Sequence, residues 1–243
     1  MESVTRHIAR IVRKLKWRLL YPELRTENNS AARRHAKVGS PKIWKMNRDF
    51  QIRFLKQIGL KSQHYLLDLG CGTLRGGIPI IDYLEKWHYF GIEVRQEVLD
   101  EGRKELQESE LVDKEPTLIA VADISSLNLE QEFDYFWAYV VLIHMEDKIL
   151  YDTISFIRRH IKDDGYFYGS VNVANRPDGN WQGFPVVFRS LQFYEEAFSR
   201  YGLHVKDLGP VEDLGYHDPR KTVQERAMHR MLKVWTAESL QPL

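Results

Sequence analysis

Short apolar runs alternate with amphipathic stretches along most of the chain after His64. The runs have the length of buried strands, and the stretches between them repeat apolar residues every three or four positions, as helices do. This alternation predicts an α/β fold with right-handed crossovers and a mainly parallel sheet that has helices on both faces. The expected strands are 65–69, 89–93, 118–123, 135–142, 166–173, 203–208 and 231–236.

The stretches between the strands predict the helices. A helix over 41–58 precedes the first strand, and Gly59 follows it at the usual C′ position. No strong helical pattern separates the last two strands, so we expect them to pair antiparallel. The other expected helices are 78–85, 96–108, 148–161 and 191–201.

Residues 4–19 form a separate amphipathic pattern in which Arg and Lys fill most of the polar positions. The pattern predicts a basic helix that ends before Pro22, followed by a polar linker or mobile lid over 25–41. Such a helix can lie on an anionic membrane surface through residues 1–21, or dock on its own domain or on a partner subunit. Its composition also resembles a mitochondrial targeting segment, although it is not rich in Ser. We therefore expect a basic extension over 1–40 and one domain over 41–243.

The totals narrow the class of protein. The 243 residues suffice for one α/β domain with an appendage, and no apolar run approaches the roughly 20 residues that span a bilayer. No secretory signal pattern is present, and the single cysteine, Cys71, excludes an intrachain disulfide. A reducing, cytoplasmic setting is the simplest interpretation. Residues 1–48 hold 13 Lys and Arg against three Glu, so a basic arm of +10 precedes a body of −9.

The stretch 65–77 reads Tyr-Leu-Leu-Asp-Leu-Gly-Cys-Gly-Thr-Leu-Arg-Gly-Gly. An apolar run carries Asp68 near its end, and Gly70 and Gly72 then allow the backbone to approach a ligand without interference from a Cβ. Ligands of open α/β sheets bind at the carboxyl ends of the strands, where this turn lies. A dinucleotide site would require a third glycine where Arg75 stands, which argues against a nicotinamide cofactor.

Acidic residues also end the next two expected strands. Glu93 lies about 20 residues beyond the glycine turn, the spacing at which a carboxylate accepts both hydroxyls of a ribose. The alternative is a solvent-exposed carboxylate at a strand end. Asp123 can contact a ligand at the same edge or cap the following turn through Ser125 and Ser126. Asp68 is placed to accept hydrogen bonds from an ammonium group.

Four stretches together resemble a known family. The turn over 65–77, the acidic strand end at Glu93, the Phe-Asp pair that opens 133–145, and the Asp-Asp-Gly turn and strand of 163–171 occur in the order found in class I S-adenosylmethionine-dependent methyltransferases. Residues 189–197 resemble a helix near the C-terminal end of many members of this family that methylate small molecules. The resemblance covers the chain from about residue 41 to the end, and it implies a Rossmann-like seven-stranded sheet.

The resemblance implies S-adenosylmethionine as methyl donor and S-adenosylhomocysteine as product. It assigns the ribose to Glu93, the adenine amino group to Asp123, and an adenine ring nitrogen to the backbone amide of Ile124. Leu74 departs from the family pattern, in which a third glycine is common at this position. The cofactor-binding residues that it implies are Asp68, Gly70, Cys71, Gly72, Thr73, Glu93, Val94, Asp123, Ile124 and Tyr139.

Methyl transfer from a sulfonium is an in-line displacement, in which the enzyme chiefly aligns the reacting atoms. An oxygen nucleophile also benefits from a general base, and we expect His144, after the fourth strand, to act as that base. The alternative is a histidine that caps or packs under the next helix. The aromatic-rich loop over 172–188 suits a substrate wall or lid. We expect Arg75, Asn172 and Trp181 to contact the substrate.

The absence of certain motifs reduces the number of methylation reactions that the chain could catalyse. The Asn-Pro-Pro-Tyr and Asp-Pro-Pro-Tyr motifs are missing, which argues against methylation of adenine N6 or glutamine, and no cysteine lies where cytosine C5 enzymes need one. No His/Cys cluster has metal-ligand spacing.

Four functional hypotheses remain. The first is O-methylation of a polar small molecule or glycan. The second is methylation of a membrane-associated lipid, quinone or lipid-linked sugar. Nucleic-acid methylation through the basic arm is a third, disfavoured by the acidic body and the missing motifs. The fourth is an S-adenosylmethionine-binding protein without catalysis. The oligomeric state stays open.

Overall fold

The computed structural model describes residues 39–181 and 183–236. The basic helix expected over 4–19 lies outside these residues, so the membrane-surface interpretation and the boundary of the basic extension stay predictions. The compact unit that begins at Lys45 is described here by itself. Within the described ranges, no helix combines the length and the apolar character that crossing a bilayer requires.

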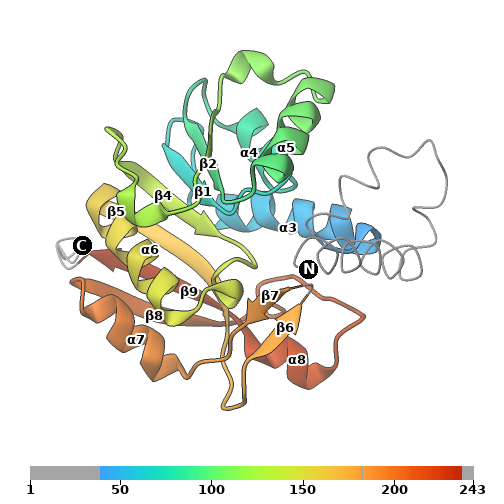
Figure 1. Ribbon diagram of the computed structural model, residues 1–243. Coiled ribbons are helices and arrows are strands. Elements are labelled where there is room, and N and C mark those ends of the chain that lie inside the picture. Colours follow the sequence, from blue (N-terminus) through green and yellow to red (C-terminus); the bar gives the residue numbers. More distant parts are fainter. Residues whose placement is uncertain (1–38, 182, 237–243) are drawn as a thin grey trace, which may run out of the picture. The chain divides into compact units, whose positions relative to one another are not determined.

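The unit is built on a seven-stranded sheet with strand order β3-β2-β1-β4-β5-β9-β8 (Figure 1). The pairs from β3 to β5 are parallel, whereas β9 runs antiparallel to both β5 and β8. The antiparallel pairing of the last two strands is confirmed. The strands are β1 (Leu66–Leu69), β2 (Tyr89–Glu93), β3 (Thr117–Ala120), β4 (Phe133–Ala138), β5 (Ile161–Asn172), β8 (Leu203–Pro210) and β9 (His229–Thr236).

Helices cover both faces of this sheet, as the alternating pattern predicts (Figure 1). Side chains alternate between the faces along each strand, so that in β4 Trp137 enters one core and Phe136 the other. Both side chains are fully buried. One core contains residues of α3 (Trp44–Gln57), α4 (Gly77–Tyr83) and α5 (Gln96–Glu108), and the other contains residues of α6 (Asp147–His160) and α7 (Leu191–Ser199).

Two strands end earlier than the sequence predicts, for local backbone reasons. The chain leaves β4 after Ala138 because Val140 adopts a φ of +60°, which is incompatible with an extended strand. It leaves β3 after Ala120 and enters a short 3₁₀ turn, η5 (Ile124–Ser126). Both departures lie at the carboxyl edge of the sheet, where the candidate site is located.

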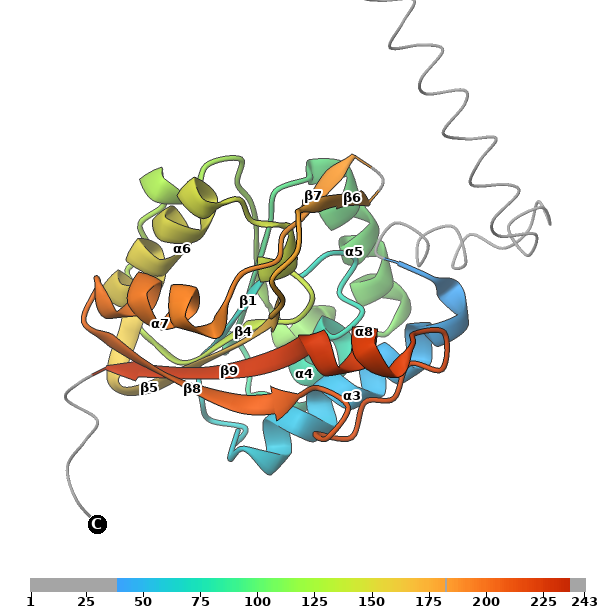
Figure 2. The same cartoon turned by 90° about the horizontal axis from the view of Figure 1, so that it is seen from below.

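Two further elements occur where the sequence predicts only connecting chain. The hairpin of β6 (Gly179–Trp181) and β7 (Phe184–Val186) lies within the expected loop over 172–188. A short helix, α8 (Val223–Met228), lies between β8 and β9. Figure 2 shows both elements. They add structure around the carboxyl edge without changing the order of the main sheet.

Candidate active site

The turn after β1 presents backbone at the carboxyl edge of the sheet. Gly70 and Gly72 have φ angles of +68° and +59°, a left-handed conformation that favours glycine. A Cβ added at Gly70 would lie 2.6 Å from a methyl carbon of Val141, so the chain after β4 packs directly on this turn. Leu74, which replaces the third glycine, also has a positive φ of 57°. The turn thus keeps a glycine-like backbone at Leu74 and buries the leucine side chain completely.

Cys71 and Thr73 lie within this turn. Cys71 is buried against Gly91, where an added Cβ would lie 2.9 Å from the sulfur, and burial raises the pKa of the thiol. Cys71 is therefore a neutral packing residue. The hydroxyl of Thr73 is fully buried and has no hydrogen-bond partner among the described residues. A buried polar atom of this kind fits a ligand that supplies the missing hydrogen bond.

Asp68 is a buried carboxyl group directly before the turn. The hydroxyl of Tyr89 donates a hydrogen bond of 2.7 Å to its Oδ2 atom. Burial, assisted by the charge of Glu93, raises the pKa of Asp68 to about 7, against the opposing effects of the hydrogen bond from Tyr89 and the charge of Arg75. The negative charge of an ionised Asp68 is therefore only partly stabilised by the protein. A cationic ligand such as an ammonium group would stabilise it further.

Glu93 ends β2 and is also buried. Its Oε1 atom accepts hydrogen bonds of 3.1 Å from the backbone amide and from the Nε atom of Arg95. The guanidinium of Arg95 also lies 5.1 Å from the ring centre of Phe184 in the β6–β7 hairpin. Val94, between the two charged residues, is exposed. Glu93 thus offers a carboxylate at a strand end, with one oxygen already engaged by Arg95.

Asp123 caps η5 in this structure. Its Oδ1 atom accepts hydrogen bonds of 2.9 Å from the amide and 2.7 Å from the hydroxyl of Ser125, and these bonds lower the pKa of the carboxyl group. This is the capping role that the sequence allows as an alternative. Ile124 is the first residue of η5. Contact of Asp123 and Ile124 with adenine stays a prediction.

The chain after β4 contacts the segment between β8 and β9 through Tyr139. The Tyr139 ring is buried, with ring centres 5.9 Å from Tyr216 and 6.0 Å from His229. Burial lowers the pKa of Arg75, and the nearby Tyr139, Tyr216 and Asp68 act in the opposite direction. Arg75 therefore lies in electrostatic reach of Asp68 as well as of the two tyrosines.

His144 is the last residue of a 3₁₀ turn, η6 (Leu142–His144). Its Nδ1 atom lies 2.7 Å from the carbonyl oxygen of Pro185. Because a carbonyl only accepts hydrogen bonds, Nδ1 carries the proton and the neutral ring has its lone pair on Nε2. Burial lowers the pKa of His144, the bond to Pro185 opposes this effect, and the charge of Arg95 lowers the pKa further. Neutral His144 thus has the electronic form of a general base.

The β6–β7 hairpin surrounds His144 with aromatic rings. The ring centres of Trp181 and Phe184 lie 5.9 and 6.1 Å from that of His144, and Trp181 is 36% exposed. Asn172, the last residue of β5, donates a long hydrogen bond of 3.4 Å to the carbonyl of Val187 beyond the hairpin. Phe184 of the hairpin thus lies near both His144 and Arg95, and Arg95 is bonded to Glu93.

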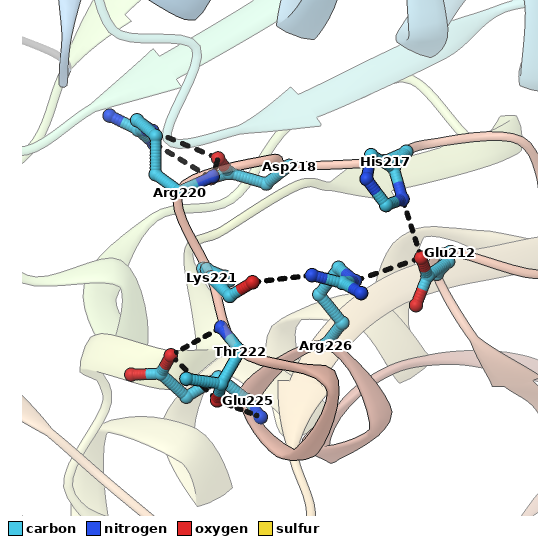
Figure 3. Close-up of polar contacts among 8 residues, drawn as sticks. All are labelled: Glu212, His217, Asp218, Arg220, Lys221, Thr222, Glu225 and Arg226. Atoms are coloured by element: carbon cyan, nitrogen blue, oxygen red, sulfur yellow. Dashed lines mark hydrogen bonds and ion pairs between the residues drawn. The ribbon is translucent and has the colours of Figure 1, made fainter.

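The structure brings most of the expected residues to one edge of the sheet, and it adds residues that sequence reasoning missed. The segment between β8 and β9 packs Tyr216 against Tyr139 and against Phe50 of α3. No motif or periodic pattern singles out this segment, because its residues meet the site only through tertiary packing. The residues missed are Tyr216, Asp218, Lys221 and His229; Figure 3 shows the polar contacts of this segment. Among the described residues, no three metal-ligating side chains cluster.

Comparison with known proteins gives a consistent result. Residues 67–167 match the protein-family model described as "Methyltransferase domain". A search of curated proteins finds no match. Similar solved structures include an S-adenosylmethionine-dependent methyltransferase from Clostridium acetobutylicum, with 15% identity, a TM-score of 0.59, and coverage of 79% of this chain and 92% of that chain.

Two further structural neighbours have the same fold. The glycopeptide N-methyltransferase MtfA in complex with S-adenosyl-L-homocysteine has 15% identity, a TM-score of 0.61, and coverage of 78% of this chain and 90% of its own. The methyltransferase CcbJ from Streptomyces caelestis has 13% identity, a TM-score of 0.60, and coverage of 83% and 92%.

The chain has a Rossmann-like sheet with the fold of these methyltransferases, and residues 67–167 carry the match to the methyltransferase-domain model. The fold of this chain is thus similar to that of the S-adenosylmethionine-dependent methyltransferases with which it is compared. The fold that the resemblance implies is confirmed.

Proposed function

We propose that this methyltransferase transfers a methyl group to an oxygen of a polar small molecule, with His144 as the general base. The observation that carries the proposal is the contact between His144 Nδ1 and the Pro185 carbonyl. This contact leaves the lone pair of Nε2 available to accept a proton, and the lowered pKa of His144 keeps the ring neutral near pH 7.

The cofactor-binding residues follow from the same edge of the sheet. Asp68 pairs with the ammonium group of the methionine part, because its buried carboxylate is stabilised by a cation. Glu93 accepts the ribose hydroxyls, and Asp123 with the amide of Ile124 contacts adenine. The residues that line the cofactor are Gly70, Cys71, Gly72, Thr73, Val94 and Tyr139, and the buried hydroxyl of Thr73 supports this placement.

S-adenosylmethionine, when bound, supplies a methyl group on a positively charged sulfur, and the sulfur keeps the electron pair of the broken bond. His144 Nε2 accepts the proton of the acceptor hydroxyl as the new carbon–oxygen bond forms. The imidazolium then returns this proton to solvent. Arg75, Asn172 and Trp181 orient the acceptor in this proposal, and the rings of Trp181 and Phe184 restrict water around His144.

A nitrogen acceptor is the second candidate. The neighbour MtfA is named a glycopeptide N-methyltransferase, and a neutral histidine serves equally to remove a proton from an ammonium group. Mass spectrometry and NMR of the methylated product distinguish the two, because an O-methyl carbon and an N-methyl carbon have different chemical shifts.

The role of His144 is tested with the full chain and a panel of hydroxylated small molecules. S-adenosylhomocysteine release measures turnover, and calorimetry measures S-adenosylmethionine binding. We expect His144→Asn to lower kcat by about 10²- to 10⁴-fold without changing cofactor affinity. His204→Asn, a change at an exposed histidine on β8, should leave both quantities unchanged. Turnover of His144→Asn near that of the unaltered enzyme would exclude the base role.

The pH dependence of turnover gives a second test of the same base. Since the pKa of His144 is lowered from 6.5, its neutral form dominates at pH 7. We expect kcat to be constant from pH 7 to 8 and to fall as the pH drops below about 6.5, where the ring gains a proton. A kcat that rises steeply between pH 7 and 9 would contradict this assignment.

A further inference from the structure

The segment between β8 and β9 encloses a small cavity beside the candidate active site. The segment continues from Pro210 to His229, which pairs with Asn172 at the end of β5. Because the cavity is small, it accommodates a terminal group of a ligand rather than a whole molecule. The residues that line it are Val211, Glu212, Tyr216, Asp218, Lys221, Arg226 and His229.

Both acidic residues of the cavity are compensated by neighbouring cations (Figure 3). Arg220 binds both carboxylate oxygens of Asp218, with its Nε atom at 2.9 Å and its Nη2 atom at 2.7 Å. The Oε1 atom of Glu212 contacts Arg226 Nε at 2.8 Å and His217 Nδ1 at 2.5 Å. Neither carboxylate is therefore left to bind a cation.

Lys221 is the remaining cation in the cavity wall. Its backbone is fixed, since its carbonyl accepts a hydrogen bond from Arg226 and its amide donates to the carbonyl of Asp218 at 3.2 Å. Over the part of the chain that the structure describes, its ammonium forms no ion pair within 4 Å. Burial lowers the pKa of Lys221, the charges of Asp218 and Glu225 oppose this effect, and the charge of Arg220 adds to it. Lys221 thus differs from Arg220 and Arg226, each of which is paired with a carboxylate.

His229 supplies the second, independent observation. The side chain is only 5% exposed, and its Nε2 atom is buried without a hydrogen-bond partner among the described residues. Burial lowers the pKa of His229 to about 3, with Lys221 acting in the same direction, so the ring is neutral at physiological pH. An unpartnered nitrogen of this kind is costly unless a ligand completes its hydrogen bond.

We propose that this cavity binds a carboxylate group of the methyl acceptor, held by the ammonium of Lys221 and by a hydrogen bond from Nε2–H of His229. A carboxylate supplies an ion-pair partner for the Lys221 ammonium and an acceptor for the buried Nε2 atom of His229, and it has the size of a terminal group. The apolar wall of Val211 and Tyr216 contacts the adjoining carbon atoms. The acceptor assignment rests on the proposed function, whereas the binding of the anion does not.

The position of the cavity is consistent with an anchor for the acceptor. His229 lies against Tyr139, and Tyr139 follows β4 directly before the chain that leads to His144. Asn172 is paired with His229 in the sheet and bonded to Val187 beside the hairpin. The anchor and the base thus flank the carboxyl ends of β4 and β5.

The binding step is tested on the full chain with acetate, and with acetamide as its neutral counterpart. The resonances of the His229 ring, assigned with His229→Asn, report occupancy in protein labelled with ¹⁵N-histidine. We expect acetate to shift these resonances in a saturable manner and acetamide to leave them in place. Lys221→Met should weaken acetate binding about 10- to 100-fold, and Lys221→Arg should retain it within a few-fold.

Lys233→Met is the matched control, because Lys233 is another half-buried lysine whose pKa burial lowers. It should leave acetate binding unchanged. Equal binding of acetate and acetamide, undiminished binding in Lys221→Met, or tighter binding of inorganic phosphate would each overturn the carboxylate assignment. Calorimetry of S-adenosylmethionine binding on the same samples tests the proposed function separately, since acetate binding does not require the methyl donor.

Discussion

Asp68 is a buried carboxyl group that is also a candidate ligand-binding residue. The sequence places a carboxylate near the end of a buried strand, and the fold then removes it from water. Its pKa of about 7 in the folded protein exceeds the ordinary value of 3.8. The folded state therefore binds this proton more tightly than the unfolded state does, and this contribution to stability falls as the pH rises from about 4 to 7.

Replacement of this carboxyl group should stabilise the ligand-free protein. We expect Asp68→Asn to raise the free energy of unfolding at pH 8 by up to about 4 kcal/mol, since the pKa shift is about three units. The same variant should lose S-adenosylmethionine binding. Urea denaturation and calorimetry measure the two effects. The exposed Asp113→Asn should change stability by less than about 0.5 kcal/mol, and a destabilised Asp68→Asn would contradict the unfavourable burial.

Cofactor affinity should also depend on the ionisation of Asp68. A bound ammonium group lowers the pKa of the carboxyl group, so binding releases a proton below pH 7. We expect S-adenosylmethionine affinity to rise with pH up to about 7, by at most tenfold per unit, and then to become constant. Calorimetry in two buffers with different ionisation enthalpies measures the released proton. An affinity that is independent of pH from 5.5 to 8 would exclude this pairing.

At the scale of the element, two helices with similar N-caps should respond differently to loss of the cap. Ser190 caps α7, and Thr222 forms a capping box with Glu225 at α8. Either change to Ala removes a cap worth about 1 kcal/mol. The helix α7 buries Tyr194 and Phe198 in a core, whereas no residue of α8 is buried. Stability of the whole domain should therefore fall in Ser190→Ala only.

Hydrogen exchange and urea denaturation check this contrast. In Thr222→Ala, exchange should accelerate locally within α8 while the urea midpoint stays nearly constant, because α8 can open without opening a core. In Ser190→Ala, the urea midpoint should fall. A global loss of stability in Thr222→Ala would show that the segment between β8 and β9 is part of the cooperative core.

At the scale of the whole molecule, the sheet separates two cores. Ile80 belongs to the core on one face and Ile154 to the core on the other, and both are fully buried. Ile80→Val and Ile154→Val should each cost about 0.5 to 1.5 kcal/mol, and the double variant should equal their sum within about 0.5 kcal/mol. Urea denaturation of the three variants measures this. A larger deviation would indicate coupling through the sheet.

The sequence predicts the main sheet well because each strand and helix has its own hydrophobic period. The expected strand over 89–93 and helix over 96–108 agree with β2 and α5 residue for residue. The expected end of β4 is wrong because Val140 turns the chain through a positive φ, which periodicity does not encode. The β6–β7 hairpin is missed because its strands have three residues each, too few to show a period of two.

The sequence by itself determined the fold class and which residues end the parallel strands, because strand order and motif spacing place them at one edge. Only the tertiary structure decided the surroundings of those residues. In the folded protein Nδ1 of His144 is bonded to the carbonyl of Pro185, which is 41 residues away, and His229 is buried beside Lys221. These contacts depend on how distant segments pack. Local sequence patterns do not predict such packing. The packing nevertheless determines how deeply each side chain is buried, and burial determines its pKa and whether its polar atoms have hydrogen-bond partners.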